Sequence, residues 1–294
     1  SYPNEQTDHI DSINNLAYQN LIKGEYELSI KLLDISLIKS KSLKYEKGIA
    51  VAYSRMGTAF LQLSDYNSSL QYLEKSLDLS EKLQEDIISA SVLNNIGSIY
   101  SAQKNYEKSL IYYRRASEIF FRTNNELSYA NTLNNIGLML YYKKDYDSAL
   151  VKYFAALAIK NKHSDSLVLA TIYSNIGMIY ADMIESSLAL SYYKIALDIS
   201  TKQDDKISIA RVCNNFGDFY FEQNNLDSAK FYFLKSLDAS TLIKRRSSMS
   251  ISFEMLANVY EKKNDYKAAN EYFGILLHYN LREFLIISNC IYEQ

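Results

Sequence analysis

The sequence predicts an all-α protein built as a solenoid of stacked helix–turn–helix hairpins. Five of the eight glycines lie forty residues apart, at Gly57, Gly97, Gly137, Gly177 and Gly217. Within each period, apolar residues recur at the spacing of an amphipathic helix, and a short polar segment divides the period into two such helices. Fixed self-similarity at this period marks supersecondary units that stack on one another.

Two alanines extend the repeat to seven units, because Ala17 and Ala257 hold the position of the glycines at the two ends. The predicted units cover about 9–45, 46–85, 86–125, 126–165, 166–205, 206–245 and 246–279. Residues 280–294 are expected to form a C-terminal capping helix, because the last hairpin of a solenoid needs cover for its apolar face. The whole chain, 1–294, is thus expected to be one solenoid.

Each unit is predicted from two helical patterns, one on each of its two helices. In the third unit, Leu93, Ile96, Gly97 and Tyr100 share one face of the first helix. The second helix carries a small residue twelve positions after the glycine and a bulky one sixteen after it, followed by another small one. In this unit these are Ser109, Tyr113 and Ala116. Small residues facing each other let the two helix axes approach closely, while the large ones fill the flanking space.

The turn between the two helices is short and polar, and Asp or Asn recurs just before the second helix, as in the segment 102–106. These side chains favour turns and accept hydrogen bonds at helix N-termini, so we expect them to cap the second helices.

These positions resemble the tetratricopeptide repeat, in which a Leu-Gly-x2-Tyr motif is followed by Ala-x3-Phe. The fourth unit shows the match through Ile136, Gly137 and Leu140, then Ala149, Tyr153 and Ala156. The resemblance covers about residues 9–277. The sequence departs from the pattern in having no Trp, no proline except Pro3, and a period of forty residues.

The longer period is similar to that of the long-repeat branch of the family, which includes bacterial sensor and regulator modules and adaptors. The resemblance implies a right-handed superhelix of about seven hairpins, whose first helices line a concave groove.

Composition excludes several function classes. The 32 basic and 34 acidic residues leave a net charge of −2, which argues against a nucleic-acid-binding surface. Cys213 and Cys290 are too few and too far apart for a disulfide framework or a zinc site. No segment reaches transmembrane length, so we expect no membrane insertion by this region. No signal peptide is evident either, and the resemblance is compatible with a bacterial cytoplasm or periplasm.

No catalytic or nucleotide-binding motif is present, and the three histidines fall at different phases of the repeat. They are His9, His163 and His278. We therefore expect a protein that is not an enzyme and needs no cofactor or metal.

A row of asparagines is the candidate binding surface. A residue two positions before the small residue is turned about 200° from it around the helix, away from the partner helix. This position holds Arg55, Asn95, Asn135, Asn175 and Asn215. Asn is a poor helix former, yet four consecutive units keep it. Its amide has a donor and an acceptor, so such a row can hold the main chain of an extended peptide.

Five neighbours share the same face and are expected to add contacts that select the ligand. They are Asn131, Leu138, Tyr142, Met178 and Arg211. A structural alternative stays open, in which the asparagines bond the neighbouring hairpin and set the pitch of the solenoid without any ligand.

The sequence thus predicts a non-catalytic scaffold or sensor that binds a protein or an extended peptide. The alternative is an input domain of a larger bacterial signalling or transcription-regulatory protein, acting through self-association or coupling to an output domain. A homo-oligomer is compatible with either function.

Overall fold

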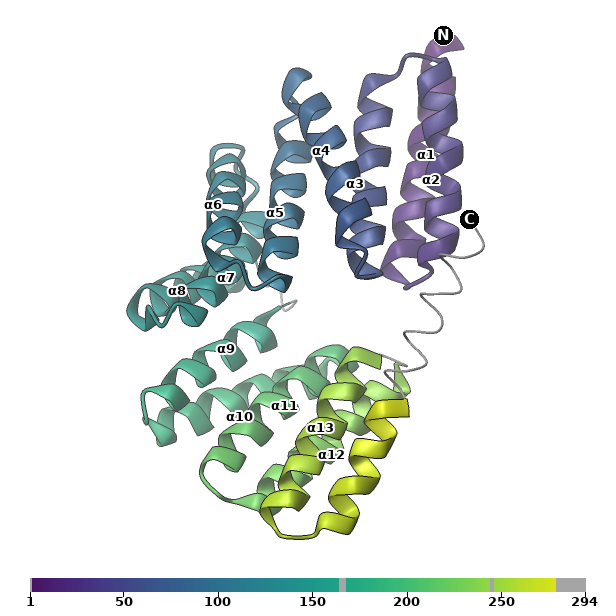
Figure 1. Ribbon diagram of the computed structural model, residues 1–294. Helices are drawn as coiled ribbons and strands as arrows, with labels where there is room; N and C mark the ends of the chain where they lie inside the picture. The colour runs from purple at the N-terminus through teal and green to yellow at the C-terminus, as the bar shows by residue number, and fades with distance from the viewer. Residues whose placement is uncertain (1, 164–167, 244–245, 279–294) are drawn as a thin grey trace. The chain divides into compact units, whose positions relative to one another are not determined.

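The computed structural model describes residues 2–163, 168–243 and 246–278, and all regular structure in these ranges is helical (Figure 1). The chain divides into two compact units, Ser1–Ile159 and Lys160–Gln294. The expected single solenoid over 1–294 remains a prediction, and the expected capping helix at 280–294 lies outside the described residues.

The first unit contains four helical hairpins. Its helices are α1 (Tyr2–Ile22), α2 (Tyr26–Ser42), α3 (Glu46–Gln62), α4 (Tyr66–Lys82), α5 (Asp86–Ala102), α6 (Tyr106–Arg122), α7 (Glu126–Tyr142) and α8 (Tyr146–Lys162), the last of which ends just past the unit boundary. Consecutive helices from α1 to α7 pack against each other, and α3 also contacts α1 and α5. The first helices of successive hairpins therefore form a continuous row.

The second unit repeats this arrangement. Its helices are α9 (Leu169–Asp182), α10 (Ser186–Lys202), α11 (Lys206–Glu222), α12 (Leu226–Leu242) and α13 (Arg246–Lys262), followed by a helical stretch over 266–278. Here α11 contacts both α9 and α13, as well as its sequence neighbours α10 and α12. The all-helical fold of paired helices expected from the repeat is confirmed, while the predicted unit boundaries remain a prediction.

The forty-residue period arises from two helices of 17 residues, each followed by three residues of turn. The helix α5 shows the common form. Its last turn is closed by hydrogen bonds from Lys104 N to Ser101 O (2.9 Å) and from Asn105 N to Tyr100 O (2.8 Å). These two bonds form a Schellman motif, which requires a left-handed residue just past the helix end.

That left-handed residue recurs every twenty positions. It is Gly24, Lys44, Ser64, Gln84, Lys104, Asn124, Lys144, Ile184, Asp204, Asn224 and Asn264. Only the first of these is a glycine, so the other turns carry the strain that a side chain adds in this conformation. The next residue is the N-cap of the following helix. Asn105, for example, accepts a hydrogen bond from Lys108 N at 3.2 Å, which confirms the expected cap.

The repeated glycines lie where the second helix of the same hairpin presses a large side chain against the first. A Cβ atom built on Gly97 would lie 2.7 Å from Cδ1 of Tyr113, and one on Gly137 would lie 2.8 Å from Cε1 of Tyr153. The large residue sixteen positions later therefore packs directly on the glycine backbone.

Serines on the second helix add a hydrogen bond that the sequence pattern did not predict. Ser69 Oγ donates to Gly57 O at 2.7 Å, and Ser109 Oγ donates to Gly97 O at 2.8 Å. Each buried hydroxyl thereby has a hydrogen-bond partner inside the hairpin, where an unpaired polar group would destabilise the fold. In these units the small side chain contributes a hydrogen bond as well as its small size.

The core joins neighbouring hairpins. One cluster combines Leu73 of α4 with Val92, Ile96 and Ile99 of α5. In the second unit, another combines Tyr193 of α10 with Phe216 and Phe219 of α11. Because each cluster spans two hairpins, a hairpin is stabilised mainly by its neighbours.

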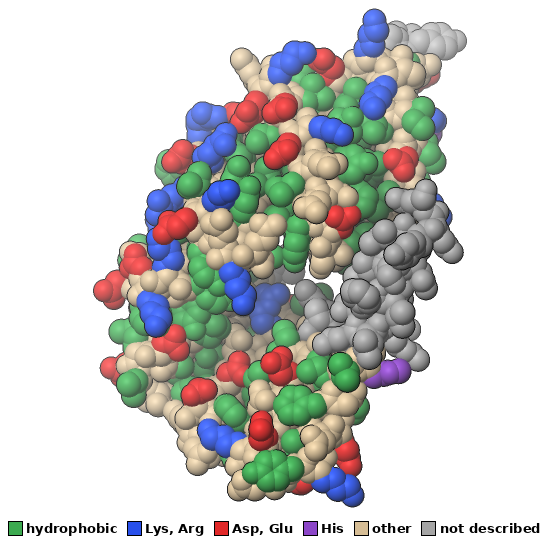
Figure 2. All heavy atoms as spheres, in the orientation of Figure 1, with side chains coloured by type: hydrophobic (Ala, Val, Ile, Leu, Met, Phe, Trp, Pro, Cys, Tyr) green, Lys and Arg blue, Asp and Glu red, His purple; other side chains and the backbone are tan. Residues whose placement is uncertain are grey.

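Charged side chains of both signs are interspersed over the face of the first unit that Figure 2 displays. The pair Arg115–Glu81 (3.0 Å) links α6 to the preceding hairpin, and Arg122–Asp86 (2.9 Å) links α6 to α5 of the same hairpin. Exposed pairs of this kind contribute about 0–1 kcal/mol each, so they adjust the stacking of hairpins without determining it.

We predict that Gly97→Ala lowers the free energy of unfolding by about 1–3 kcal/mol, because the added methyl meets the ring of Tyr113 and the ring is held by packing. Chemical denaturation followed by circular dichroism measures the change. Gly274→Ala is the matched control, since no atom lies within 4 Å of the position of its Cβ. Equal stability of the two variants would contradict the proposed close approach.

We also predict that Lys104→Gly raises the free energy of unfolding by up to about 1 kcal/mol. The substitution removes the strain of a side chain at φ 59° but adds backbone freedom to the unfolded chain. The same measurement on Glu118→Gly, inside α6, should show a loss of about 1 kcal/mol. A loss at both positions would mean that the turn has no left-handed strain.

Candidate functional site

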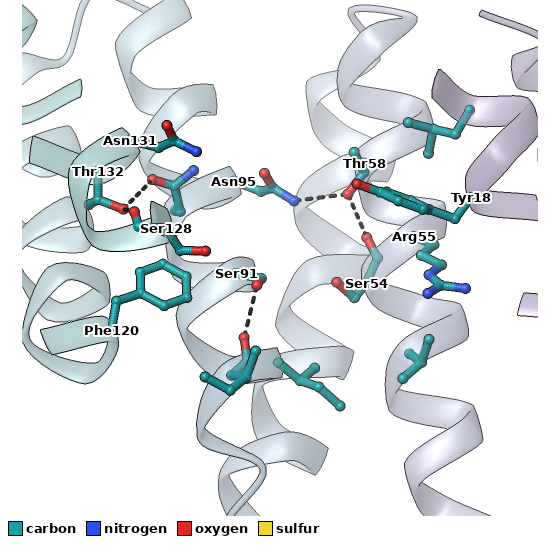
Figure 3. Close-up of a pocket in the computed structure, with 15 residues that line it drawn as sticks. Tyr18, Ser54, Arg55, Thr58, Ser91, Asn95, Phe120, Ser128, Asn131 and Thr132 are labelled. Atoms are coloured by element: carbon teal, nitrogen blue, oxygen red, sulfur yellow. Dashed lines mark hydrogen bonds between the residues drawn. The ribbon is translucent and has the colours of Figure 1, made fainter. Parts of the chain in front are cut away.

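A groove of about 490 Å³ opens on the row of first helices in the first unit (Figure 3). It is lined by side chains from α1, α3, α5 and α7, with Phe120 from the end of α6. Hydroxyl and amide groups predominate among the polar lining residues. They are Ser54, Thr58, Ser91, Asn94, Asn95, Ser128, Asn131 and Thr132, with Tyr18 at one side.

Asn95 lies in this groove and points from α5 toward α3 (Figure 3). Its Nδ2 donates to Thr58 Oγ1 at 2.8 Å, while the Thr58 hydroxyl donates to Ser54 O at 2.9 Å. Because the only hydroxyl proton of Thr58 is used by Ser54, the Thr58 oxygen must accept, and the Asn95 amide orientation follows. The Asn95 Oδ1 has no hydrogen-bond partner among the described residues and remains available as an acceptor.

Asn135 makes a similar connection one hairpin later. Its Nδ2 donates to Asn94 Oδ1 at 3.3 Å, and the same oxygen accepts from Thr132 Oγ1 at 3.3 Å. Asn134 Nδ2 reaches Asn135 Oδ1 at a long 3.5 Å. This network ties α7 to α5, while Asn131, one turn earlier on α7, is exposed and lines the groove (Figure 3).

Two predicted contact residues of α7, Leu138 and Tyr142, lie further along the helix and do not line this groove. Leu138 is half-buried, and Tyr142 is 45% exposed, with its ring stacked on Tyr106 at a centroid distance of 4.9 Å. Partial burial raises the pKa of Tyr142, and the nearby Tyr106 adds to the rise. Tyr142 therefore presents a neutral aromatic surface.

Among the described residues that line the groove, Arg55 is the only one with a charged side chain. Its guanidinium lies 5.2 Å from the ring centroid of Tyr18, and its Nη2 donates to Asn15 Oδ1 at 3.2 Å. Burial lowers the pKa of Arg55, although Tyr18 and Asp11 partly oppose this effect. An arginine nevertheless keeps its proton, so the groove contains one positive charge.

The remaining predicted residues lie in the second unit. Asn215 Nδ2 donates to Ser174 Oγ at 3.0 Å and to the sulfur of Met178 at 3.1 Å. A thioether sulfur can only accept, so the Asn215 Oδ1 must point the other way, and no described residue bonds to it. Asn175 is only 5% exposed, which leaves it less accessible than the other three asparagines. Arg211 is exposed, and its Nη1 donates to Thr171 Oγ1 at 3.1 Å.

The nitrogen and the oxygen of the amide groups in the asparagine row thus differ in their contacts. The amide nitrogens of Asn95, Asn135 and Asn215 bond to side chains of the preceding first helix. The oxygens of Asn95 and Asn215 have no bond within the described residues. A peptide held here would therefore meet acceptors rather than paired donors and acceptors.

Acidic groups occupy the corresponding face of α11. Asp218 is exposed at the surface, yet the protein around it still reduces its hydration, and this burial raises the pKa of Asp218 to about 6. The negative charge of Glu222, one turn later, contributes to the same rise. This face therefore contains a carboxyl group that changes charge close to neutral pH.

Sequence reasoning missed several lining residues of the first-unit groove. Tyr18, Thr58 and Phe120 contribute to it, but none of them lies on the asparagine row. The Thr58 position could have been found from its spacing, because it lies three residues after Arg55 and faces the same side of α3. Phe120 could not, because it comes from a second helix, and the period alone does not show which of its residues reach the groove.

Chemical features outside the groove are few. Burial raises the pKa of the Cys213 thiol to about 12, so this cysteine is unreactive packing material. Within 2–163, 168–243 and 246–278, no group of three or more His, Cys, Asp or Glu residues is placed to hold a metal ion. No helix in the same ranges has the length and apolar character that crossing a bilayer requires.

Comparison with known families identifies the repeat. Sequence models described as tetratricopeptide repeat match residues 50–83, 88–162 and 168–242, which together make up more than half of the chain. No curated protein matches the chain.

Several solved structures share the fold. The apo form of RapI has a TM-score of 0.74 at 18% identity, with 94% of this chain and 98% of that chain covered. A Rap protein complexed with Competence and Sporulation Factor has a TM-score of 0.74 at 15% identity, covering 92% and 74%. The Rap conjugation gene regulator of the plasmid pLS20, in complex with a Phr peptide, has a TM-score of 0.70 at 16% identity, covering 92% and 73%. At these identities the similarity establishes the fold.

The raised pKa of Asp218 predicts a stability change with pH. The native state holds this proton more tightly than the unfolded chain does, so stability is lost as the pH rises from about 4 to about 6. Asp218→Asn should therefore be more stable than the wild type at pH 8, and the difference should disappear below pH 4. Thermal unfolding at the two pH values measures it.

Asp227→Asn provides a control of opposite sign. Lys263 lowers the pKa of Asp227 through a hydrogen bond and its charge, so that this carboxylate stabilises the fold at neutral pH. Its replacement should not raise the melting temperature at pH 8. A gain at both positions would indicate a general effect of net charge.

Proposed function

The chain belongs to the tetratricopeptide repeat family, and we propose that it is a non-catalytic sensor or scaffold whose first-helix face binds an extended peptide. The observation that carries this proposal is the polar groove of the first unit. In this groove the Asn95 amide nitrogen bonds to Thr58, while its oxygen has no partner among the described residues. Oxygen acceptors at such positions suit the N–H groups of an extended main chain.

The comparisons support the ligand class. The Rap conjugation gene regulator, which shares the fold, was solved in complex with a Phr peptide. Hydroxyl and amide side chains outnumber the apolar residues in the lining of the groove, which suits a ligand with polar groups along its length. An extended peptide has unsatisfied main-chain groups along its length, whereas a helix has satisfied them internally.

The proposed roles follow from the geometry. Asn95 and Asn215 are main-chain acceptors, each in its own unit, while Asn135 and Asn175 chiefly hold neighbouring hairpins in register. Asn131 and Arg211 are exposed polar contacts. Leu138, Tyr142 and Met178 are apolar contacts for side chains of the ligand, because each retains accessible surface beside the row.

The second candidate function is an input domain of a larger signalling or transcription-regulatory protein. It is favoured by one observation, the fold similarity to a structure described as a conjugation gene regulator. Both candidate functions use the same peptide groove. They differ in what peptide binding causes, since only the input domain would pass a change on to an output domain or a second copy. A change in oligomeric state on addition of a bound peptide, measured by analytical ultracentrifugation, would favour the second.

We predict that Asn95→Ala weakens peptide binding up to about tenfold, because one hydrogen bond contributes about 0.5–1.5 kcal/mol. The probe is a random hexapeptide library selected on the immobilised wild-type chain, with recovered peptides measured by calorimetry. Asn67→Ala is the matched control, since this asparagine is exposed on α4, a second helix. Thermal unfolding of each variant separates a loss of binding from a loss of fold.

Peptides methylated at one backbone nitrogen test the main-chain contact directly. The wild type should lose affinity for the peptide that lacks the critical N–H, while Asn95→Ala should bind the methylated and unmethylated forms equally. If no library peptide binds the wild type, or if binding does not respond to Asn95→Ala in the folded chain, the proposed groove is wrong.

A further inference from the structure

The helix α8, the second helix of the fourth hairpin, is apolar on the side that faces away from its hairpin (Figure 1). Its inner side includes Tyr153, which is fully buried. The opposite side carries four exposed apolar residues, which we call the α8 outer face. They are Val151 (64% exposed), Phe154 (42% exposed), Ala155 and Ala158. At 100° per residue these four side chains form one stripe about 100° wide along the helix.

The α8 outer face differs from the same positions in the other second helices. In each of α2, α4, α6, α10 and α12, at least two of the four equivalent positions hold Lys, Arg, Asp or Glu. In α6 the four residues are Ile111, Arg114, Arg115 and Glu118. Charged side chains are typical of the solvent side of a helix, whereas a contiguous exposed apolar stripe marks an interaction surface. We therefore expect a partner to cover the α8 outer face.

The sizes of the four side chains indicate the shape of that partner. Two large residues, Val151 and Phe154, are followed along the helix by two small ones, Ala155 and Ala158. Small residues let a second helix approach closely, provided that it places large side chains over them. A second α8 running in the opposite direction has this order. Phe154 then faces Ala155 of the partner subunit, and Val151 faces Ala158 of the partner subunit.

The charges at the two ends of α8 agree with the same alignment. Asp147 and Lys162 lie on the stripe of the outer face and are exposed. The antiparallel alignment that pairs large with small residues also places Asp147 opposite Lys162 of the partner subunit. A two-fold axis makes each such contact occur twice. A parallel alignment would instead place like charges and large side chains against each other, so size and charge both favour the antiparallel one.

We propose that the α8 outer face binds the same face of a second copy of this chain, which forms a two-fold symmetric dimer with antiparallel α8 helices. The dimer goes beyond the proposed peptide-binding function and does not depend on it, because no residue of α8 lines the groove. The face supplies about six residues per copy, fewer than the about 20–30 residues per side of a standard interface. The dimer is therefore weak, reversible and dependent on concentration.

Sedimentation velocity on the full chain tests the association, over a range from about 1 μM to about 1 mM. The sedimentation coefficient of the wild type should rise with concentration. Val151→Glu should weaken the dimer at least about tenfold, because its carboxylate would be buried against an alanine without a positive partner. Gln71→Glu is the matched control, since it adds the same charge at the same repeat position on the exposed side of α4. Circular dichroism establishes that both variants are folded.

Engineered cysteines test the direction of the two helices. In the antiparallel dimer the two copies of residue Ala155 lie next to the two-fold axis, while the two copies of Ala158 are about 10 Å apart along the helices. A disulfide requires Cα atoms within about 7 Å of each other. In a chain that also carries Cys290→Ser, mild oxidation should therefore cross-link Ala155→Cys and leave Ala158→Cys monomeric on a non-reducing gel.

Three results would overturn the proposed dimer. A wild type that stays monomeric throughout the concentration range would leave the α8 outer face to another partner. Association that survives Val151→Glu would place the interface elsewhere. Cross-linking at Ala158→Cys as strong as at Ala155→Cys would reject the antiparallel alignment. None of these results depends on a peptide, so failure of the dimer is distinguished from failure of the groove, which Asn95→Ala tests.

Discussion

The structure depends on the contact between a glycine on the first helix of a hairpin and a large side chain sixteen residues later on the second. Where the second helix presses Tyr113 onto Gly97, an added Cβ would lie 2.7 Å from Cδ1 of the ring, so the ring packs directly on the glycine backbone. Helices packed through small residues approach more closely than helices packed through large ones. Because the contact recurs every forty residues, each hairpin offers its neighbour nearly the same surface.

That constraint explains why the groove is polar. Most apolar residues of each first helix pack against the partner helix and the preceding hairpin, as in the cluster of Leu73 with Val92 and Ile96. The remaining face carries mostly hydroxyls and amides, together with a few apolar residues such as Val51 and Ile88. These groups bond across the row, from Asn95 to Thr58 and from Asn135 to Asn94. These bonds use the amide nitrogens of Asn95 and Asn135, and the Asn95 oxygen keeps no bond within the described residues.

Much of the fold could be predicted from the sequence because its determinants are local and repeated. The glycine period, the Asp and Asn caps and the helical stripes each depend on spacings within one hairpin, and the structure confirms them. The aromatic pairs were only half predicted. Tyr100 was expected to be large, but its stacking on Tyr112 at 5.4 Å depends on the rotation of the second helix.

The site was less predictable, because its chemistry depends on contacts between hairpins. Asn95 and Asn175 occupy the same position in the repeat, yet Asn175 is nearly buried and Asn95 lines a groove. The sequence shows that Arg55 interrupts the asparagine row. It does not show that Tyr18 and Asn15 hold the guanidinium. Such contacts lie about forty residues apart or involve a different helix, where a spacing rule has no information.

Repeated and unrepeated positions therefore have different consequences for recognition. An extended peptide held only by identical asparagines could shift along the row and find the same contacts. The repeated side chains therefore provide affinity but do not fix the position of the peptide along the row. A register requires a group that occurs once. Arg55 is such a group in the first unit, and Asp218, with its carboxyl group titrating near neutral pH, is one in the second. Specificity in this protein should therefore depend on the residues that break the forty-residue period, because the residues that keep it are already committed to the fold.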